Sequence, residues 1–219
     1  MGARAMQGER RGYRKRRRAD LEAETRLRIT VSALELHGTV GPAQTSISAV
    51  ARRAGVRRST VYRHFPDETA LFRACSAHWA VQNPLPDLEA WAAIVPPNDR
   101  LGVALIDLYG FFQRTEQMLD NLFRDETTVP AVRQQFGRFR GYLQQARDVL
   151  MAGRAIRGDA RRRTQGAIGH AVAFSTWKSL VRDQMLSDGE AVALMAAAVS
   201  SAASVKGVET NSGGRRRTD

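Results

Sequence analysis

The 219-residue sequence has only one cysteine, Cys75, so it cannot form an internal disulfide. It has no run of eighteen apolar residues, and its most apolar stretch, residues 191–205, is mostly alanine with interspersed serine. Such a stretch predicts a packed helix and not a membrane span. The arginine-rich N-terminus lacks the apolar segment of a secretory signal. These absences predict a cytoplasmic protein, associated with the nucleoid if it binds DNA.

Motifs of the common enzyme classes are also missing. The sequence has no HExxH, GxSxG, Walker or GxGxxG motif, and its four histidines are not clustered. No second histidine or cysteine lies three or four residues from His170, the spacing that would place two metal ligands on one helix face. We therefore expect no catalytic residues, no cofactor and no bound metal.

Acidic residues are scarce where basic residues gather. Residues 1–65 carry 15 Lys and Arg against 5 Asp and Glu, whereas residues 66–205 carry 15 of each. The net charge of +12 is therefore concentrated near the N-terminus, which indicates a surface that binds a polyanion.

Strand-like alternation is absent, and apolar residues recur at helical spacing along most of the chain. A first helix is expected from about Leu21 to Gly38. Further helices are predicted at 46–54, 57–64, 67–83, 98–112, 130–151, 159–182 and 187–204, the last beginning with a Ser187–Glu190 capping box. The predicted fold class is all-α.

Residues 46–64 have the pattern of a helix-turn-helix. Ala51 is small enough for two helices to cross closely, Gly55 can adopt the positive φ of the turn, and Val61 anchors the second helix. From Arg52 to His64 there are five arginines and no acidic residue. Arginine reads guanine edges, and hydroxyl and imidazole groups often bind phosphates. The pattern therefore predicts a DNA-contacting second helix.

The segment TSISAVARRAGVRRSTVYRHFPDETALF, residues 45–72, resembles the TetR family of bacterial regulators. The resemblance spans Arg26–Trp79, and the rest of the chain matches only as a helical architecture. It implies DNA contacts from the recognition helix and from the start of the helix before it. The implied contact residues are Thr45, Ser46, Arg57, Arg58, Ser59, Thr60, Tyr62, Arg63 and His64.

Three positions depart from the family pattern. Arg57 replaces the usual small capping residue, which predicts a weaker cap and unusual specificity. His37 stands where the family usually has an aromatic core residue. Glu68 occupies a position where a lysine commonly reaches a phosphate, so one expected contact is lost and the N-terminal arginines would have to compensate.

The resemblance implies a transcriptional regulator, a repressor by family default, that binds a palindromic operator as a homodimer. It further implies release of the DNA by a small-molecule effector. An effector-independent architectural DNA-binding protein is the alternative, although the helical segment at residues 66–205, which has no net charge, would then have no evident function. The predicted segments are a basic disordered arm (1–20), a helix-turn-helix domain (21–66), a larger helical effector and dimerisation domain (67–205) and a disordered tail (206–219).

The effector site is expected among the aromatic residues of the larger domain, which would suit a hydrophobic ligand. The candidates are Trp79, Tyr109, Phe112, Phe123, His170, Phe174 and Trp177. For each aromatic residue, and for His170, plain core packing is an alternative. Cys75 is expected to be a small buried apolar residue and not a redox sensor.

Two further regions have predicted partners. The helices at 164–182 and 187–204 are rich in glycine, alanine and serine, which allow close packing of helices in a four-helix dimer interface. The N-terminal arm is expected either to contact DNA without specificity, or only to aid solubility, or to enter the minor groove beside the operator.

Overall fold

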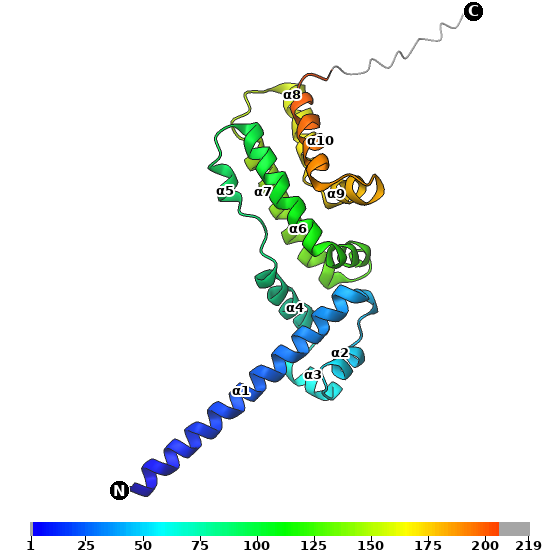
Figure 1. Cartoon of the computed structure of the whole chain (residues 1–219). Coiled ribbons are helices and arrows are strands. Elements are labelled where there is room, and N and C mark those ends of the chain that lie inside the picture. The colour runs from blue at the N-terminus through cyan, green and yellow to red at the C-terminus, as the bar shows by residue number, and fades with distance from the viewer. Residues whose placement is uncertain (1, 206–219) are drawn as a thin grey trace, which may run out of the picture. The chain divides into compact units, whose positions relative to one another are not determined.

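The computed structural model describes the backbone of residues 2–205 and the side chains of residues 12–205. Within this range the chain is helical and has no strand, as predicted (Figure 1). The predicted tail lies outside the described residues. The elements, in order, are α1 (Gly2–Thr39), the 3-10 turn η1 (Pro42–Gln44), α2 (Ile47–Arg53), α3 (Arg58–His64), α4 (Glu68–Gln82), α5 (Leu88–Ala92), α6 (Pro97–Asp125), α7 (Pro130–Met151), α8 (Gly158–Ala171), α9 (Phe174–Lys178), the π-helical turn η2 (Ser179–Asp183) and α10 (Asp188–Ser201).

Side-chain caps set several of the helix starts, because a helix begins with backbone N–H groups that have no partner inside it. Ser46 accepts a hydrogen bond from the backbone N–H of Ala49 at the start of α2. Asp67 accepts one from Ala70 at the start of α4. Ser187 and Glu190 form the predicted capping box at the start of α10.

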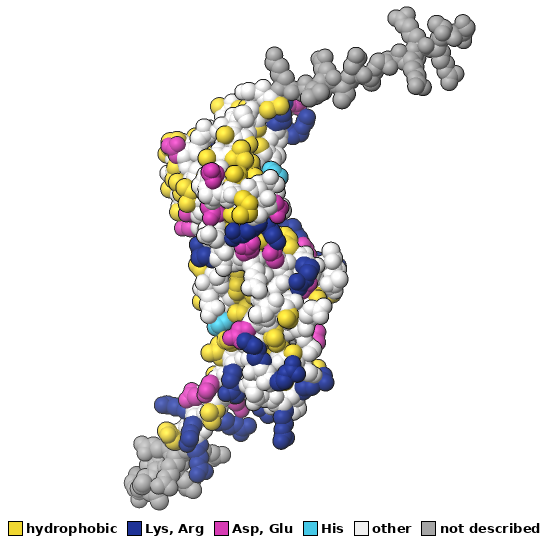
Figure 2. All heavy atoms as spheres, turned by 45° about the vertical axis from the view of Figure 1, so that its right-hand side comes forward, with side chains coloured by type: hydrophobic (Ala, Val, Ile, Leu, Met, Phe, Trp, Pro, Cys, Tyr) yellow, Lys and Arg dark blue, Asp and Glu magenta, His cyan; other side chains and the backbone are white. Residues whose placement is uncertain are grey.

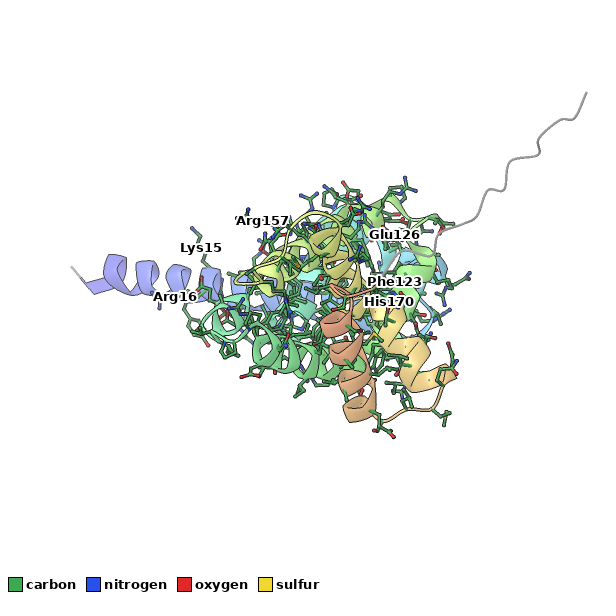
Figure 3. The ribbon with its side chains drawn as sticks, turned by 90° about the horizontal axis from the view of Figure 1, so that it is seen from above. Lys15, Arg16, Phe123, Glu126, Arg157 and His170 are labelled. Carbon is green, nitrogen blue, oxygen red and sulfur yellow. The ribbon has the colours of Figure 1, made fainter. Side chains whose placement is uncertain are left out.

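The N-terminal arm differs from the sequence prediction, since residues 2–20 are helical and not disordered. They form the first half of α1. Arginine, lysine, alanine and glutamate favour helices, and extending an existing helix needs no new nucleus. An ion pair of 3.2 Å between Arg18 and Glu22 joins adjacent turns. The side chains of residues 12–20 are exposed, and Figure 3 shows Lys15 and Arg16 projecting from the helix.

Three predictions for the later chain differ from the structure. The helix expected at 98–112 continues to Asp125 as α6. The single helix expected at 159–182 is broken at residues 172–173 into α8, α9 and η2. Neither glycine nor proline marks the break, but the hydroxyl of Tyr109 donates a 2.9 Å hydrogen bond to the carbonyl of Ala171 there. The short helix α5 was not predicted, because its five residues lie between prolines and are too few for a periodic pattern.

The described part of the chain forms two compact units. The first unit contains residues 2–86 and 111–142, and the second contains 87–110 and 143–205. Helix α4 belongs with α1 and α2 because Leu71 and Cys75 lie in the same apolar core as Ile29 of α1 and Val50 of α2.

The second unit is organised around buried groups with specific partners. The indole N–H of Trp177 donates to Asp188 at the start of α10, and that of Trp91 donates to Asp107. Arg100 is only 6% exposed and donates to four backbone carbonyls, those of Ile94, Val95, Val149 and Ala152. Val149 and Ala152 lie at the C-terminal end of α7, where helix carbonyls lack intrahelical partners.

Candidate nucleic-acid interface and an apolar cavity

Helices α2 and α3 form the predicted helix-turn-helix. Ala51 and Val61 are buried in the core of the first unit, as the motif requires. Gly55, in the turn, has φ 65°, a conformation that favours glycine. The backbone N–H of Val56 donates to the carbonyl of Ala51, which closes the end of α2. The spacing of these residues therefore presents the opposite face of α3 to solvent.

The exposed face of α3 is basic and polar. Arg57, Arg58, Ser59, Tyr62 and Arg63 are exposed, whereas Thr60 and His64 are half-buried. Figure 2 shows Lys and Arg side chains gathered over the part of the molecule that contains α1–α3. This arrangement can donate hydrogen bonds to phosphates and to guanine edges.

His64 lies at the edge of this face and is partly withdrawn from it. Its Nε2 atom is buried and has no hydrogen-bond partner. Burial, together with the charges of Arg63 and Arg26, lowers the pKa of His64, against a smaller opposing effect of Glu22. Arg26 donates a 2.6 Å hydrogen bond to the His64 carbonyl and lies over the Phe65 ring. Arg26 therefore holds the end of α3.

The three departures from the family pattern have distinct structural settings. Arg57 is the N-cap of α3 and makes no side-chain capping hydrogen bond, as expected for a weak cap. Glu68 lies in the first turn of α4, where a negative charge interacts favourably with the helix dipole. His37 is buried, with its ring centroid 5.3 Å from that of Phe72. The Thr45 hydroxyl donates a hydrogen bond to the Gly41 carbonyl, and the Ser46 hydroxyl accepts one from the Ala49 N–H.

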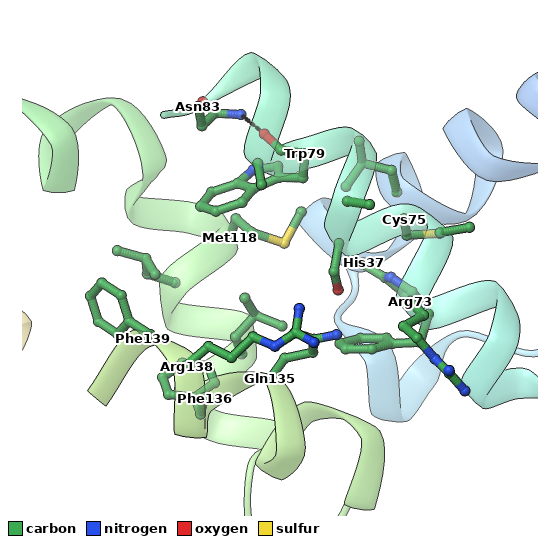
Figure 4. A pocket seen from close by; sticks show the side chains of 18 of the residues that line it. His37, Arg73, Cys75, Trp79, Asn83, Met118, Gln135, Phe136, Arg138 and Phe139 are labelled. Carbon is green, nitrogen blue, oxygen red and sulfur yellow. Dashed lines mark hydrogen bonds between the residues drawn. The ribbon is translucent and has the colours of Figure 1, made fainter. Parts of the chain in front are cut away.

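The first unit also contains an apolar cavity of about 810 Å³ (Figure 4). Its wall is formed by residues of α1, α4, α6 and α7. The apolar part consists mainly of Leu34, Phe72, Trp79, Phe111, Met118, Leu119, Leu122, Phe136 and Phe139. Its volume lies within the range of pockets that enclose small organic molecules.

Only one of the seven predicted effector residues, Trp79, lines this cavity. Tyr109, Phe174 and Trp177 are buried in the second unit, and Phe112 is fully buried without reaching the cavity. Phe123 is 40% exposed beside Phe136. His170 is hydrogen-bonded to the hydroxyl of Thr176, but it is exposed, so the prediction of a buried core histidine was wrong.

The polar residues of the cavity were missed by the sequence prediction. They are Arg26, His37, Arg73, Ser76, Asn83, Gln135 and Arg138. The one available signal was His37, a polar residue where the family pattern has an aromatic one. Cys75 also lines the cavity. It is buried, its thiol donates to the Thr30 carbonyl, and burial raises its pKa to about 12, so it behaves as the expected apolar residue.

The C-terminal end of α6 is tied to the segment that leads into α2. The Asn121 side-chain amide donates to the carbonyls of His37 and Gly38, at 3.0 and 2.9 Å. Arg124 donates to the Val40 carbonyl, and buried Asp125 accepts a 2.9 Å hydrogen bond from the backbone N–H of Ala43. We call these contacts the α6 clamp. Burial alone would raise the pKa of Asp125, but the hydrogen bonds from Arg124 and Ala43 lower it.

We expect His37 to make stability depend on pH. Burial lowers the pKa of His37 from 6.5 to about 4, although the charge of Asp125 raises it. Between these values the unfolded chain binds a proton that the folded chain does not, so the free energy of unfolding falls as the pH falls through this window. The full shift corresponds to roughly 3 kcal/mol.

Urea unfolding of His37→Phe at several pH values checks this expectation. Phenylalanine can still pack on Phe72 but cannot titrate, so the slope of stability against pH between 4 and 6.5 should flatten. A smaller slope of the same sign should remain from His64. An unchanged slope in the variant would show that His37 is not the titrating group.

No helix in the described part of the chain is long and apolar enough to cross a membrane. Among the described residues, no group of three or more His, Cys, Asp or Glu side chains could hold a metal ion.

Comparisons with known proteins agree with this architecture. A family model described as bacterial regulatory proteins of the TetR family matches residues 29–75. Comparison with curated proteins gives no significant match.

Solved structures share the fold at low sequence identity. A TetR-like transcriptional regulator from a Rhodococcus species has a TM-score of 0.60 and 16% identity, covering 83% of this chain and 97% of that chain. A TetR-family regulator from Mesorhizobium loti has a TM-score of 0.58 and 18% identity, and the match covers 85% of this chain and 98% of that chain. NalD of Pseudomonas aeruginosa is the secondary repressor of the MexAB-OprM multidrug efflux pump. It has a TM-score of 0.51 and 20% identity, and the match covers 81% of this chain and 94% of that chain.

Proposed function

Because the chain is a TetR-family transcription regulator, with the family's DNA-binding domain at residues 29–75, we propose that it binds a palindromic operator as a homodimer. We further propose that a small apolar effector in the cavity releases it. The observation that carries the proposal is the exposed basic face of α3 on a correctly packed helix-turn-helix.

In this proposal α3 enters the major groove. Arg57, Arg58 and Arg63 supply guanidinium donors for guanine edges or phosphates, and Ser59, Thr60, Tyr62 and His64 supply neutral donors. Thr45 and Ser46 lie beside the N-terminus of α2, where backbone N–H groups favour a phosphate. Arg53 is committed elsewhere, since it forms a 2.5 Å ion pair with Glu35.

The helical arm favours phosphate contacts over minor-groove insertion. An α-helix with side chains is about 10–12 Å wide, whereas the minor groove of B-DNA is about 6 Å wide. The described arm would have to unwind to enter it. Exposed residues Arg14–Arg18 would instead follow the DNA backbone and compensate for the missing lysine at Glu68.

Small exposed side chains on α8 and α10 support the proposed dimer. Gly166 on α8 and Ala193, Ala197 and Ala198 on α10 are exposed in the single chain, as is Leu194, at 46%. Small residues allow helices of a partner to approach closely. A two-fold dimer would present two recognition helices to the two halves of a palindrome.

The α6 clamp offers a route from the cavity to the DNA-binding helices. Met118, Leu119 and Leu122 of α6 line the cavity, and Asn121, in the same turn, holds the end of α1. An effector that displaced α6 would therefore move the segment before α2. This change would alter the separation of the two recognition helices in a dimer.

Footprinting on genomic fragments selected by the purified protein tests the proposal. Discrete protection of a palindrome, with loss of protection on adding an effector, is expected.

In the same assay Arg58→Ala should reduce the preference for a particular base at one operator position and lower the binding free energy by about 1–3 kcal/mol, if Arg58 reads a guanine. Tyr62→Phe should weaken all sequences alike, because a phosphate contact carries no base information.

Continuous protection without preferred sites would instead identify an architectural DNA-binding protein. Uniform loss of affinity in both variants would contradict the assignment of Arg58 to a base.

A further inference from the structure

The cavity wall carries positive charge and no negative charge. Three arginines line it, Arg26, Arg73 and Arg138, and no Asp or Glu is among its lining residues. The other ionisable groups of the wall are uncharged at neutral pH, because burial lowers the pKa of His37 to about 4 and raises that of Cys75 to about 12. A cation entering this cavity would meet repulsion with no counter-charge, whereas an anion would meet attraction.

In two of the three arginines the guanidinium N–H groups are available to bind a ligand. Arg26 is committed to the carbonyl of His64 and the ring of Phe65. Arg73 and Arg138 form no side-chain hydrogen bond or ion pair with any residue whose side chain the structure describes. On α7, by contrast, Arg140 is paired with Glu126.

Arg138 is the better placed of the two free arginines. Figure 4 shows its side chain extending from α7 into the cavity, next to the side chain of Gln135, whereas Arg73 points away from it. Both arginines are exposed and Gln135 is half-buried, so the charged groups lie near solvent. A guanidinium can bind a carboxylate through two parallel hydrogen bonds, and the Gln135 amide adds a further donor.

The deeper wall is aromatic and aliphatic. Phe111 and Leu119 are buried, and the Trp79 ring packs edge-on against Phe111 with centroids 6.1 Å apart. Phe136 and Phe139 pack in the same way at 6.0 Å. These surfaces can enclose an apolar body but give it few hydrogen bonds. The cavity is thus polarised, with an apolar interior and cationic donors near solvent.

We propose that the cavity binds an organic acid, with an apolar body against Trp79, Phe111 and Phe136 and one carboxylate at Arg138 and Gln135. This ligand class rests on the proposed function only in that the same cavity is taken as the effector site. Neutral molecules with the same body bind less tightly, and lipophilic cations bind least. Arg73 adds to the positive potential without contacting the ligand.

Displacement of the fluorescent probe anilinonaphthalene sulfonate from the DNA-free protein, checked by calorimetry, tests the proposal. Two matched series are used, naphthylacetate with naphthylethanol and naphthylethylammonium, and decanoate with decanol and decylammonium. In the better-fitting series the acid should bind at least about tenfold more tightly than the alcohol, as expected for one charged hydrogen-bonded pair. The ammonium compound should bind most weakly. An alcohol that binds as tightly as its acid, or the absence of acid binding below millimolar concentration, overturns the proposal.

Variants locate the carboxylate. Arg138→Gln should lower the affinity for the acid about tenfold and leave that for the alcohol unchanged, and Arg138→Lys should retain part of the preference. Arg114→Gln is the matched control, because Arg114 is exposed on α6 and does not line the cavity. Equal losses for acid and alcohol in Arg138→Gln would indicate a distorted cavity and contradict the proposal.

The operator assay separates this inference from the proposed function. If the acid binds with the expected preference but does not release DNA, the ligand class stands and the effector role fails. If neutral compounds bind as well as acids and release DNA equally, the effector role stands and the ligand class is wrong.

Discussion

Arg100→Met should lower the free energy of unfolding by about 3–5 kcal/mol, because it removes a buried charged donor that four backbone carbonyls share. Among the described residues, only the carbonyl of Val149 keeps another partner, the N–H of Ala152. The Arg100 guanidinium donates to carbonyls on both sides of it, those of Ile94 and Val95 before α6 and those of Val149 and Ala152 at the end of α7. Its positive charge also lies at the C-terminal end of α7, where the helix dipole is negative.

Chemical and thermal unfolding of matched variants measures this effect. For a chain of this size the melting temperature should fall by roughly 10 °C. Arg100→Lys keeps the charge, but a single ammonium cannot reach four carbonyls in a planar arrangement, so an intermediate loss is expected. Arg161→Met, an exposed position in the same unit, should change stability by less than about 0.5 kcal/mol. A loss at Arg100 no larger than at Arg161 would show that the carbonyls are satisfied without the guanidinium.

The features predicted correctly from sequence depend on residues close together in the chain. The Ser46 cap and the Ser187–Glu190 capping box involve positions three apart, and the turn at Gly55 needs one residue of positive φ. The core positions Ala51 and Val61 belong to the same short motif. Residues that are neighbours in the sequence determine these features, and the packing of distant segments does not change them.

The features that were missed depend on contacts between distant segments. Arg100 is one arginine among many in the sequence, and its burial follows from carbonyls about fifty residues later. The break after Ala171 coincides with a hydrogen bond from Tyr109, which no local pattern shows.

The cavity wall was missed for a related reason. Aromatic residues on α6 and α7 are equally compatible with the core and with a cavity until the facing helices are known. Phe111 and Phe112 are adjacent and both buried, yet only Phe111 reaches the cavity. Composition therefore indicated an aromatic site without indicating which residues form it.

Gly41→Ala should destabilise the first unit by about 3–5 kcal/mol, through backbone strain and disruption of the α6 clamp. Gly41 has φ 92° and ψ 159°, a region that almost only glycine occupies. A Cβ atom there would overlap the Arg124 guanidinium and lie 2.6 Å from Oδ2 of Asp125. Arg124 can turn toward solvent, but the Asp125 side chain is 4% exposed and accepts the hydrogen bond from Ala43, so it cannot move without losing that bond.

Gly55→Ala is the matched control, measured beside Gly41→Ala by urea unfolding at neutral pH. Gly55 also has positive φ, but a Cβ atom there would meet no atom within 4 Å, so only the left-handed strain of about 1–2 kcal/mol is expected. The excess loss at Gly41 measures how tightly the end of α6 holds the segment before α2. Equal losses at the two glycines would mean that the clamp yields to a methyl group, and it could not then transmit a displacement of α6 to the recognition helix.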